Sequence, residues 1–206
     1  IMARDARESR LAYLKEHYGI QTTPDNKKVV AWADAVILAI KPQTLLEVSA
    51  ELRGRFKANQ TLISIIAGAR IGTLVKGTGH SAVVRVMPNT PAQIGEGISV
   101  WTATPAVTEP QRQWASSILK AIGREIYVDD EQYLDMATAI SGSGPAYFFL
   151  FAEVLVEAAV KIGLPRNMAQ ELVLQTMLGS GHLIQQSGKE LAELRRMVTS
   201  PGGTTA

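Results

Sequence analysis

The distribution of hydrophobic residues separates the chain into a first part with short apolar runs and a last part with long apolar helices. Three largely apolar runs in the first part predict strands: residues 35–40, 61–66 and 82–87. The first two are typical of parallel strands covered on both faces. Helical patterns surround them, at residues 5–18, 44–53 and 71–76, with a short helix ending near Trp32. Two further strand-like segments, 97–102 and 125–128, flank a helix that starts at Thr108. This alternation predicts an α/β fold with a Rossmann-type doubly wound parallel sheet.

The pattern changes near Asp129, after which we find no further strand signal. Long helical segments rich in Ala, Leu and Val follow, at residues 134–140, 145–162 and 165–186. We therefore predict a dinucleotide-binding domain at residues 1–128 and an all-helical domain at residues 129–206. Helices with many small residues and little polar surface pack closely, so we expect self-association through the second domain.

Composition and charge narrow the possible functions. Lys and Arg number 21 against 19 Asp and Glu, with no basic stripe, so we expect no nucleic-acid partner. Cysteine is absent, which excludes disulfides, thiolate nucleophiles and cysteine metal sites. We interpret the separated His17, His80 and His182 as surface or helix-end residues, and we expect no metal.

The most apolar stretch, residues 146–160, contains two carboxylates on one helical face, Glu153 and Glu157. We interpret it as a partly buried helix and expect no membrane partner. The start of the sequence shows no charged, apolar-cored signal segment, so we expect a cytoplasmic protein.

Candidate chemistry lies where ligands of doubly wound sheets bind, beyond the carboxyl ends of the strands. Three segments follow predicted strands there: residues 39–43, 66–69 and 87–92. Each one alone is better explained by structure, as a strand end, a tight turn or a proline-stiffened loop. Together they predict one site at one edge of the sheet, where small residues let a planar ring approach the backbone.

Two glycine-rich clusters lie in or beside the helical part, at residues 141–145 and 200–205. The first opens a helix at Pro145, and both offer backbone N–H groups and hydroxyls. Helix N-termini and amide nests attract anions, so we expect a carboxylate ligand, with flexible linkers as the alternative reading.

Four of these segments resemble the signatures of pyrroline-5-carboxylate reductases in sequence, order and spacing. They are Ala-Ile-Lys-Pro at 39–42, Met-Pro-Asn-Thr-Pro-Ala at 87–92, Ser-Gly-Ser-Gly-Pro-Ala-Tyr at 141–147 and Ser-Pro-Gly-Gly-Thr-Thr at 200–205. The resemblance implies a Rossmann domain followed by a helical dimerisation domain, with a pocket shared between two subunits. It implies reduction of an imine, 1-pyrroline-5-carboxylate, to L-proline with NADPH or NADH, the last step of proline biosynthesis.

The resemblance also implies roles for individual residues. Those lining the cofactor would be Asn26, Ala39, Lys41, Pro42 and Ala67, with Asn89 near the nicotinamide. The loop at 200–205 would hold the substrate carboxylate through Ser200, Gly202, Gly203 and Thr204, while the catalytic Thr205 hydroxyl reaches the imine nitrogen. A protonated imine accepts hydride without a metal or covalent intermediate, so amides and hydroxyls suffice.

Cofactor choice rests on the residues that follow the first visible strand. Arg4 and Arg7 could meet a 2′-phosphate, which favours NADP. Asp5 between them could bond a ribose hydroxyl, which is the NAD preference, or cap its helix.

The sequence also departs from the family. Ile1-Met2-Ala3 has the character of a buried strand, and the family's first strand, its glycine-rich turn and its last helices are missing. We therefore expect a fragment that binds dinucleotide weakly and dimerises incompletely. Two alternatives stay open: a β-hydroxyacid dehydrogenase-like reductase using Lys161, and a non-catalytic dinucleotide-binding homo-oligomer.

Overall fold

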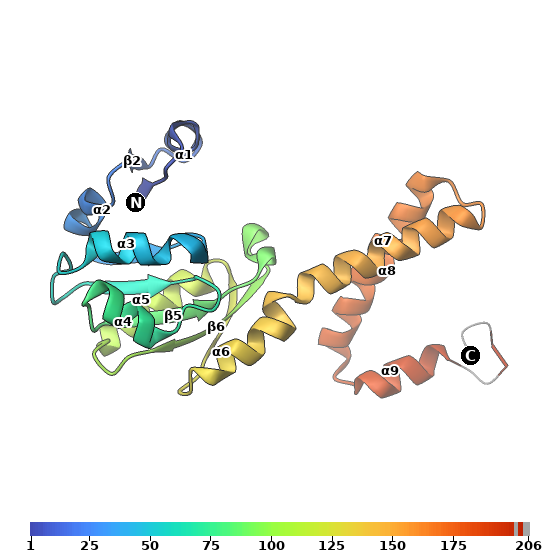
Figure 1. The fold of residues 1–206 in the computed structure, drawn as a ribbon. Helices are drawn as coiled ribbons and strands as arrows, with labels where there is room; N and C mark the ends of the chain where they lie inside the picture. The colour runs from blue at the N-terminus through green and yellow to red at the C-terminus, as the bar shows by residue number, and fades with distance from the viewer. Residues whose placement is uncertain (200–201, 204–206) are drawn as a thin grey trace. The chain divides into compact units, whose positions relative to one another are not determined.

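The computed structural model describes residues 1–199 and 202–203 (Figure 1). The chain forms two compact units, Ile1–Pro145 and Ala146–Ala206. Among the described residues all strands belong to the first unit, and the second contains helices alone. The predicted fold class, an α/β domain followed by a helical one, is confirmed.

The core of the first unit is a five-stranded sheet. Its strands are, in spatial order, β3 (Ala35–Leu38), β4 (Thr61–Ser64), β5 (Val83–Met87), β6 (Gly97–Ala103) and β7 (Gly123–Tyr127). The three apolar runs of the sequence form β3, β4 and β5, which are parallel neighbours. Every residue of β4 is buried, because helices cover both faces of the sheet there.

The sheet is mixed, which the sequence pattern did not predict. β6 runs antiparallel to β5, and β7 runs parallel to β6. Only a short 3-10 helix, η2 (Thr90–Ile94), lies between β5 and β6. A parallel neighbour needs a long crossover, so this short connection produces an antiparallel pair.

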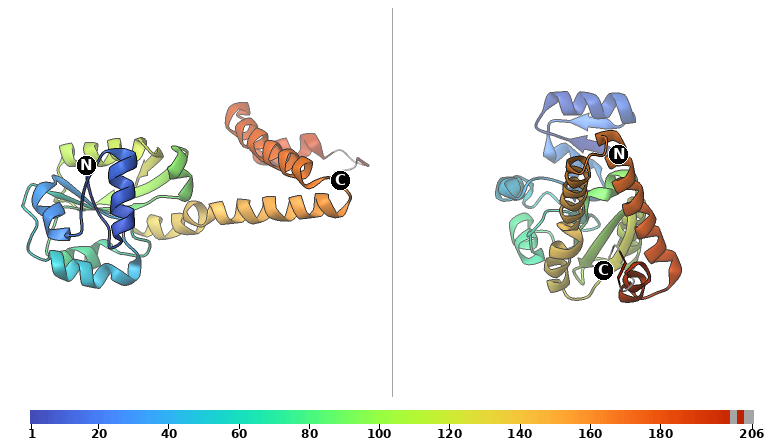
Figure 2. Two further views of the ribbon diagram at one scale, coloured as in Figure 1. Left: turned by 90° about the horizontal axis from the view of Figure 1, so that it is seen from above. Right: turned by 90° about the vertical axis from the view of Figure 1, so that its right-hand side faces the viewer.

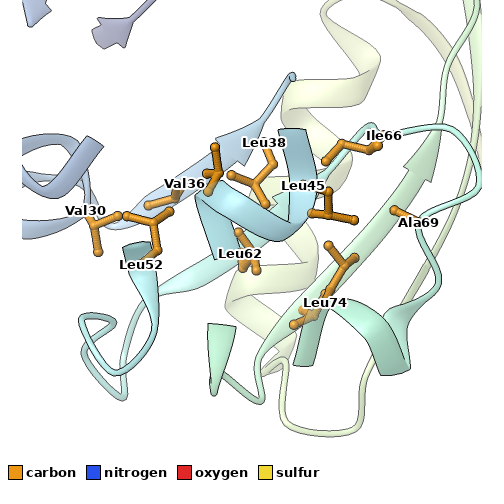
Figure 3. Packing of buried hydrophobic residues seen from close by; sticks show 11 residues of the cluster. Val30, Val36, Leu38, Leu45, Leu52, Leu62, Ile66, Ala69 and Leu74 are labelled. Atoms are coloured by element: carbon orange, nitrogen blue, oxygen red, sulfur yellow. The ribbon is translucent and has the colours of Figure 1, made fainter. Parts of the chain in front are cut away.

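The two faces of the sheet carry separate clusters of buried side chains. Helices α3 (Leu45–Leu52) and α4 (Ile71–Thr78) cover one face, and Figure 3 shows their side chains packed against those of β3 and β4. Helix α5 (Glu109–Lys120) covers the other face through Ala115 and Leu119. Figure 2 shows the sheet between α3 and α5 in the view from above.

The beginning of the chain forms a second, two-stranded sheet. Strands β1 (Met2–Arg4) and β2 (Gln21–Thr23) are parallel, and α1 (Glu8–Tyr18) connects them. The sequence predicted α1 and its end at Gly19, which has a left-handed φ of 62°. It missed β2, because Gln21, Thr22 and Thr23 form no apolar run and only Thr23 is buried.

Other local signals are confirmed at the ends of helices. Asp25 accepts a hydrogen bond from the Lys27 N–H and caps α2 (Asn26–Trp32). Thr108 and Gln111 form a capping box at the start of α5, which the sequence predicted at Thr108. The capping residues satisfy backbone N–H groups that have no partner within the helix.

Described residues after Asp130 form helices only. They are α6 (Gln132–Ala137), the π-helical turn η3 (Thr138–Gly142), α7 (Gly144–Lys161), α8 (Arg166–Ser187) and α9 (Leu191–Val198). Helix α9 lies in a stretch for which we predicted no element. The domain boundary near Asp129 stays a prediction, since the compact units divide after Pro145.

Candidate functional site

The carboxyl edge of the parallel strands gathers the three candidate loops. β3, β4 and β5 are adjacent and in register, with Ile37 opposite Ile63 and Ile63 opposite Val84. The segments at residues 39–43, 66–69 and 87–92 follow these strands directly. They therefore lie side by side along one edge, where doubly wound sheets bind nucleotides.

The first loop exposes a cation at the start of a helical turn. Lys41 is exposed and caps η1 (Pro42–Thr44), with Pro42 in the first helical position. The Lys41 carbonyl accepts bonds from the Thr44 hydroxyl at 2.9 Å and from the Thr44 N–H at 3.0 Å. These bonds fix the backbone, so the exposed Lys41 side chain starts from a defined position.

The second loop is a tight turn of small, exposed residues. Ala67 and Gly68 are exposed, and the Ala69 N–H donates to the Ile66 carbonyl at 3.2 Å. Gly68 has φ of 73°, a conformation in which a side chain is strained. The turn therefore presents backbone and methyl groups to whatever lies over this edge.

The third loop is anchored by a carboxamide. The Asn89 side-chain oxygen accepts the Ile98 N–H at 2.9 Å, which ties the end of β5 to the start of β6. Asn89 is half-buried and begins η2. Its position is therefore set by the sheet itself.

Two residues expected at the ribose end lie where β1 ends: Arg4 is its last residue and Asp5 follows it. The Arg4 Nε donates to the Pro24 carbonyl at 3.2 Å. The Asp5 carboxylate accepts the Arg7 N–H at 2.8 Å and lies 3.4 Å from the Arg7 Nε. The backbone bond from Arg7, with the nearby positive charge, lowers the pKa of Asp5. Asp5 therefore forms a turn that leads into α1 and is already engaged with Arg7.

The structure places Asn26 apart from the three loops. Its side-chain amide donates to the Glu51 carboxylate at 2.6 Å, near the last residue of α3. Lys41 and Pro42 precede the first residue of the same helix. A helix rises about 1.5 Å per residue, so Asn26 and Lys41 mark opposite ends of α3.

Comparison with known proteins decides the family. The profile of the pyrroline-5-carboxylate reductase dimerisation family matches residues 131–206, and that of the coenzyme F420-dependent NADP oxidoreductases matches residues 1–68. A pyrroline-5-carboxylate reductase of Pseudomonas aeruginosa is 41% identical over 206 residues, which are 100% of this chain and 76% of the relative.

This chain belongs to the pyrroline-5-carboxylate reductase family. It is an NAD(P)H-dependent oxidoreductase.

Solved structures of the family agree with the fold. The reductase of Coxiella burnetii has a TM-score of 0.86 at 36% identity, covering 100% of this chain and 77% of that one. The Plasmodium falciparum reductase, solved with NADP bound, has a TM-score of 0.89 at 31% identity, covering 99% of this chain and 75% of that one.

Most of the reductase's expected substrate loop lies outside the described residues. Ser200, Thr204 and the catalytic candidate Thr205 belong to that part. Gly202 and Gly203 are described, and Gly202 has φ of 73°. The roles of these residues, like those of the cofactor residues, stay predictions.

The other glycine-rich cluster, residues 141–145, differs from the expectation. The helix expected at Pro145 begins at Gly144, but it continues a helical segment that runs from Gln132 to Lys161. The Ser143 N–H donates to the Thr138 carbonyl at 2.8 Å within a π-helical turn. The expectation of a free helix N-terminus is therefore wrong, because the preceding turn already accepts bonds from its backbone.

The helical segment from Gln132 to Lys161 is long and apolar, which matters for two predictions, the absence of a membrane partner and self-association. By length and apolar composition it could cross a membrane, which we did not expect from its two carboxylates. Its second half, α7, exposes apolar side chains around the helix in the single chain: Phe148, Phe149, Leu150, Phe151 and Val154. The match to a dimerisation family over residues 131–206, which include α7, indicates self-association.

One of the three histidines, His80, is buried and packs within the first unit. His80 is buried, its Nε2 lies 2.8 Å from the Gln60 carbonyl, and its ring stacks on Phe56. It therefore has a packing role at the end of α4, where we expected surface exposure as one of two readings. Among residues 1–199 and 202–203, no three His, Cys, Asp or Glu side chains gather as a metal site.

Sequence reasoning missed one polar cluster. Arg85 is the only charged residue of β5 and its side chain is 2% exposed. It forms ion pairs with Glu131 and Asp135 at the start of α6. A single arginine within the apolar run Val83–Met87 was the available signal, because a buried charge requires partners.

Proposed function

We propose that this reductase converts 1-pyrroline-5-carboxylate to L-proline with NADPH, which binds along the carboxyl edge of β3, β4 and β5. The observation that carries the proposal is the alignment of three parallel strands whose loops hold the family's signature residues. We assign cofactor contacts to Arg4, Asp5, Asn26, Ala39, Lys41, Pro42, Ala67 and Asn89.

The exposed groups at this edge suit a dinucleotide. Ala39, Ala67 and Gly68 are small and exposed, so a flat ring or a pyrophosphate can approach the backbone. Lys41 is an exposed cation beside them, and a cation stabilises phosphate charge. Asn89 lies at the third loop, next to the strand end where we place the nicotinamide.

NADPH is favoured over NADH by the two exposed arginines on either side of Asp5. An aspartate that selects NADH accepts a bond from the ribose 2′-hydroxyl. Here the Asp5 carboxylate is engaged by the Arg7 N–H, while Arg7 and Arg4 are exposed. Arg7 engages one oxygen of Asp5, Oδ1, and it is the two exposed arginines that support a 2′-phosphate at this position.

The bound cofactor supplies the hydride, so the chain's own task is to place the imine and manage its charge. We assign the substrate carboxylate to Ser200, Gly202, Gly203 and Thr204, and the imine nitrogen to the Thr205 hydroxyl. Backbone N–H groups in a glycine-rich turn bind a carboxylate well, and Gly202 has the left-handed φ that such turns use. A fixed hydroxyl then orients the ring for attack on its carbon.

We further propose that the active form is a homodimer built through the helical unit. Side chains of α7 and α8 line an apolar groove of about 470 Å³. Its lining includes Phe148, Phe151, Leu155 and Leu172. A second copy that covers this groove removes the exposed apolar surface from water. We also propose that the enzyme is cytoplasmic, which cell fractionation tests.

The test is NADPH oxidation in the presence of 1-pyrroline-5-carboxylate by the full-length wild-type protein and by its Thr205→Ala variant. We expect kcat/KM of the variant to fall about 10-fold or more, the size of effect expected when a positioned polar group is lost. Thr199→Ala is the matched control, since the Thr199 hydroxyl donates to the Arg195 carbonyl at 2.8 Å.

Each outcome decides a different part of the proposal. No turnover by the wild type with either cofactor would overturn the reaction. Equal activity of Thr205→Ala and Thr199→Ala would overturn the assignment of Thr205 and leave the reaction standing.

A further inference from the structure

The buried arginine of β5 lies under the edge of the sheet that carries the nicotinamide loop. Arg85 is two residues before Met87, where β5 ends, and Asn89 follows two residues later. Its side chain points to the face covered by α3 and α4, because the neighbouring Val84 and Val86 pack on the α5 face. A guanidinium that is only 2% exposed must be held by counter-charges.

Both counter-charges come from the first turn of α6. Arg85 Nη1 donates to the Glu131 carboxylate at 2.8 Å, and Nη2 donates to the Asp135 carboxylate at 2.7 Å. Glu131 Oε1 also accepts the Ile71 N–H at 2.7 Å, which occupies an N–H that α4 leaves without a helical partner. One carboxylate thus joins α6 to β5 and to α4.

The far end of α6 touches the same strand. α6 continues into the π-helical turn Thr138–Gly142, and a Cβ on Gly142 would lie 2.5 Å from the Met87 methyl. The π-helical turn therefore lies against the end of the Met87 side chain, the last residue of β5. π-helical turns within α-helices are frequent at functional sites.

These contacts lie on both sides of the end of β5, from which the proposed nicotinamide loop, residues 87–92, continues. The ion pairs fix α6 at one end, and Gly142 lies against Met87 at the other. The Asn89 oxygen holds the next turn of chain through the Ile98 N–H. A shift of α6 would therefore move the π-helical turn relative to Met87 and Asn89.

We propose that Arg85, Glu131 and Asp135 are positioning residues of the reductase, which hold the π-helical turn Thr138–Gly142 against the loop that receives the nicotinamide. The inference rests on the proposed placement of the nicotinamide at Asn89. The three side chains act through Met87 and the turn, and they touch neither cofactor nor substrate.

Glu131→Gln and Asp135→Asn test the proposal, because each keeps the shape and removes the charge. We expect kcat to fall about 10-fold, since displacements of about 1 Å can cost 100-fold in rate. NADPH affinity, measured by titration without substrate, should stay within about 3-fold of wild type, because positioning affects kcat more than binding. Amide hydrogen exchange should accelerate more at residues 138–142 than in β4, whose buried amides report only the change in global stability.

Lys120→Gln is the matched control. It removes an ion pair with Glu125, 3.7 Å long, on the face of the sheet opposite to α6. The control should lose no more than about 2-fold in kcat, in line with the small contribution of exposed ion pairs. Arg85→Lys gives a further variant that keeps the buried charge but replaces the two-pronged donor, and the same pattern is expected.

The proposal is overturned if the carboxylate variants keep wild-type kcat, or if exchange rises equally in β4, which indicates general loss of stability. It is also overturned if kcat and NADPH affinity fall together. Absence of turnover in the wild type would instead contradict the proposed function, and hydrogen exchange at residues 138–142 would still report on the ion pairs.

Discussion

Removing both carboxylates around Arg85 should cost the protein much more stability than removing either one. The guanidinium is 2% exposed, whereas the side chains of Glu131 and Asp135 are 30% and 42% exposed. Either single variant, Glu131→Gln or Asp135→Asn, leaves the buried cation one charged partner. The double variant leaves none.

The magnitudes follow from this asymmetry. A hydrogen bond to a charged group contributes about 1.5–3 kcal/mol, and a retained amide oxygen recovers part of it, so each single variant should cost about 1 kcal/mol. An uncompensated buried charge costs about 3–5 kcal/mol, which we expect for the double variant. The excess over the sum of the singles is therefore about 1–3 kcal/mol.

Arg85→Met added to the double variant sharpens the prediction. Methionine fills part of the space and removes the buried charge, so the triple variant should be more stable than the double by about 2 kcal/mol. A purely geometric role for Arg85 predicts the opposite order, because the arginine stem would be lost as well.

Urea denaturation followed by tryptophan fluorescence measures these differences in the first unit. All three tryptophans, Trp32, Trp101 and Trp114, lie in that unit. Strictly additive free energies of unfolding, or a triple variant less stable than the double, would refute the reasoning.

Three further results are expected. Leu74→Ala should cost about 3 kcal/mol of unfolding free energy, since this leucine is fully buried between α4 and the sheet, and its activity per folded molecule should match wild type. The hydrogen bond from Arg85 lowers the pKa of Asp135, so its stabilisation is present above the unfolded value of about 3.9 and is lost as pH falls through the lower folded value. The gap in urea midpoint between wild type and Asp135→Asn should therefore shrink from pH 5 towards pH 2, and a constant gap would contradict this. Arg4→Ala should lower kcat/KM for NADPH by about 10-fold and leave that for NADH within about 2-fold, as expected for loss of a phosphate contact; equal losses would count against the assigned contact.

The strands that form the binding edge could be predicted because each is a short apolar run with polar ends. Residues 35–40, 61–66 and 82–87 contain β3, β4 and β5, and burial on both faces of β4 and β5 is the physical reason that these two strands are mostly apolar. β2 could not be predicted in the same way, because two of its three residues are partly open to water. Its pairing with β1 arises from the crossover through α1, which is a tertiary constraint.

The site was predicted from motifs and not from contacts, and this explains what was missed. Nothing in the local pattern says that Asp5 is engaged by Arg7 or that Asn26 contacts Glu51, since both depend on side-chain geometry. The ion pairs of Arg85 join residues 46 and 50 positions apart, which no local periodicity encodes. The helix at Pro145 was expected to have an open start, but a π-helical turn precedes it.

The exposed phenylalanines and leucines of α7 link folding to the amount of protein present. If burial by a second copy supplies much of the stability of the helical unit, mass action makes that stability rise with concentration, whereas the core of the sheet is complete within one chain. Dilution then loosens the helices first and leaves the nucleotide edge folded. A cell that makes little of this protein would hold folded sheets without an assembled pocket, so activity per molecule would itself depend on expression level.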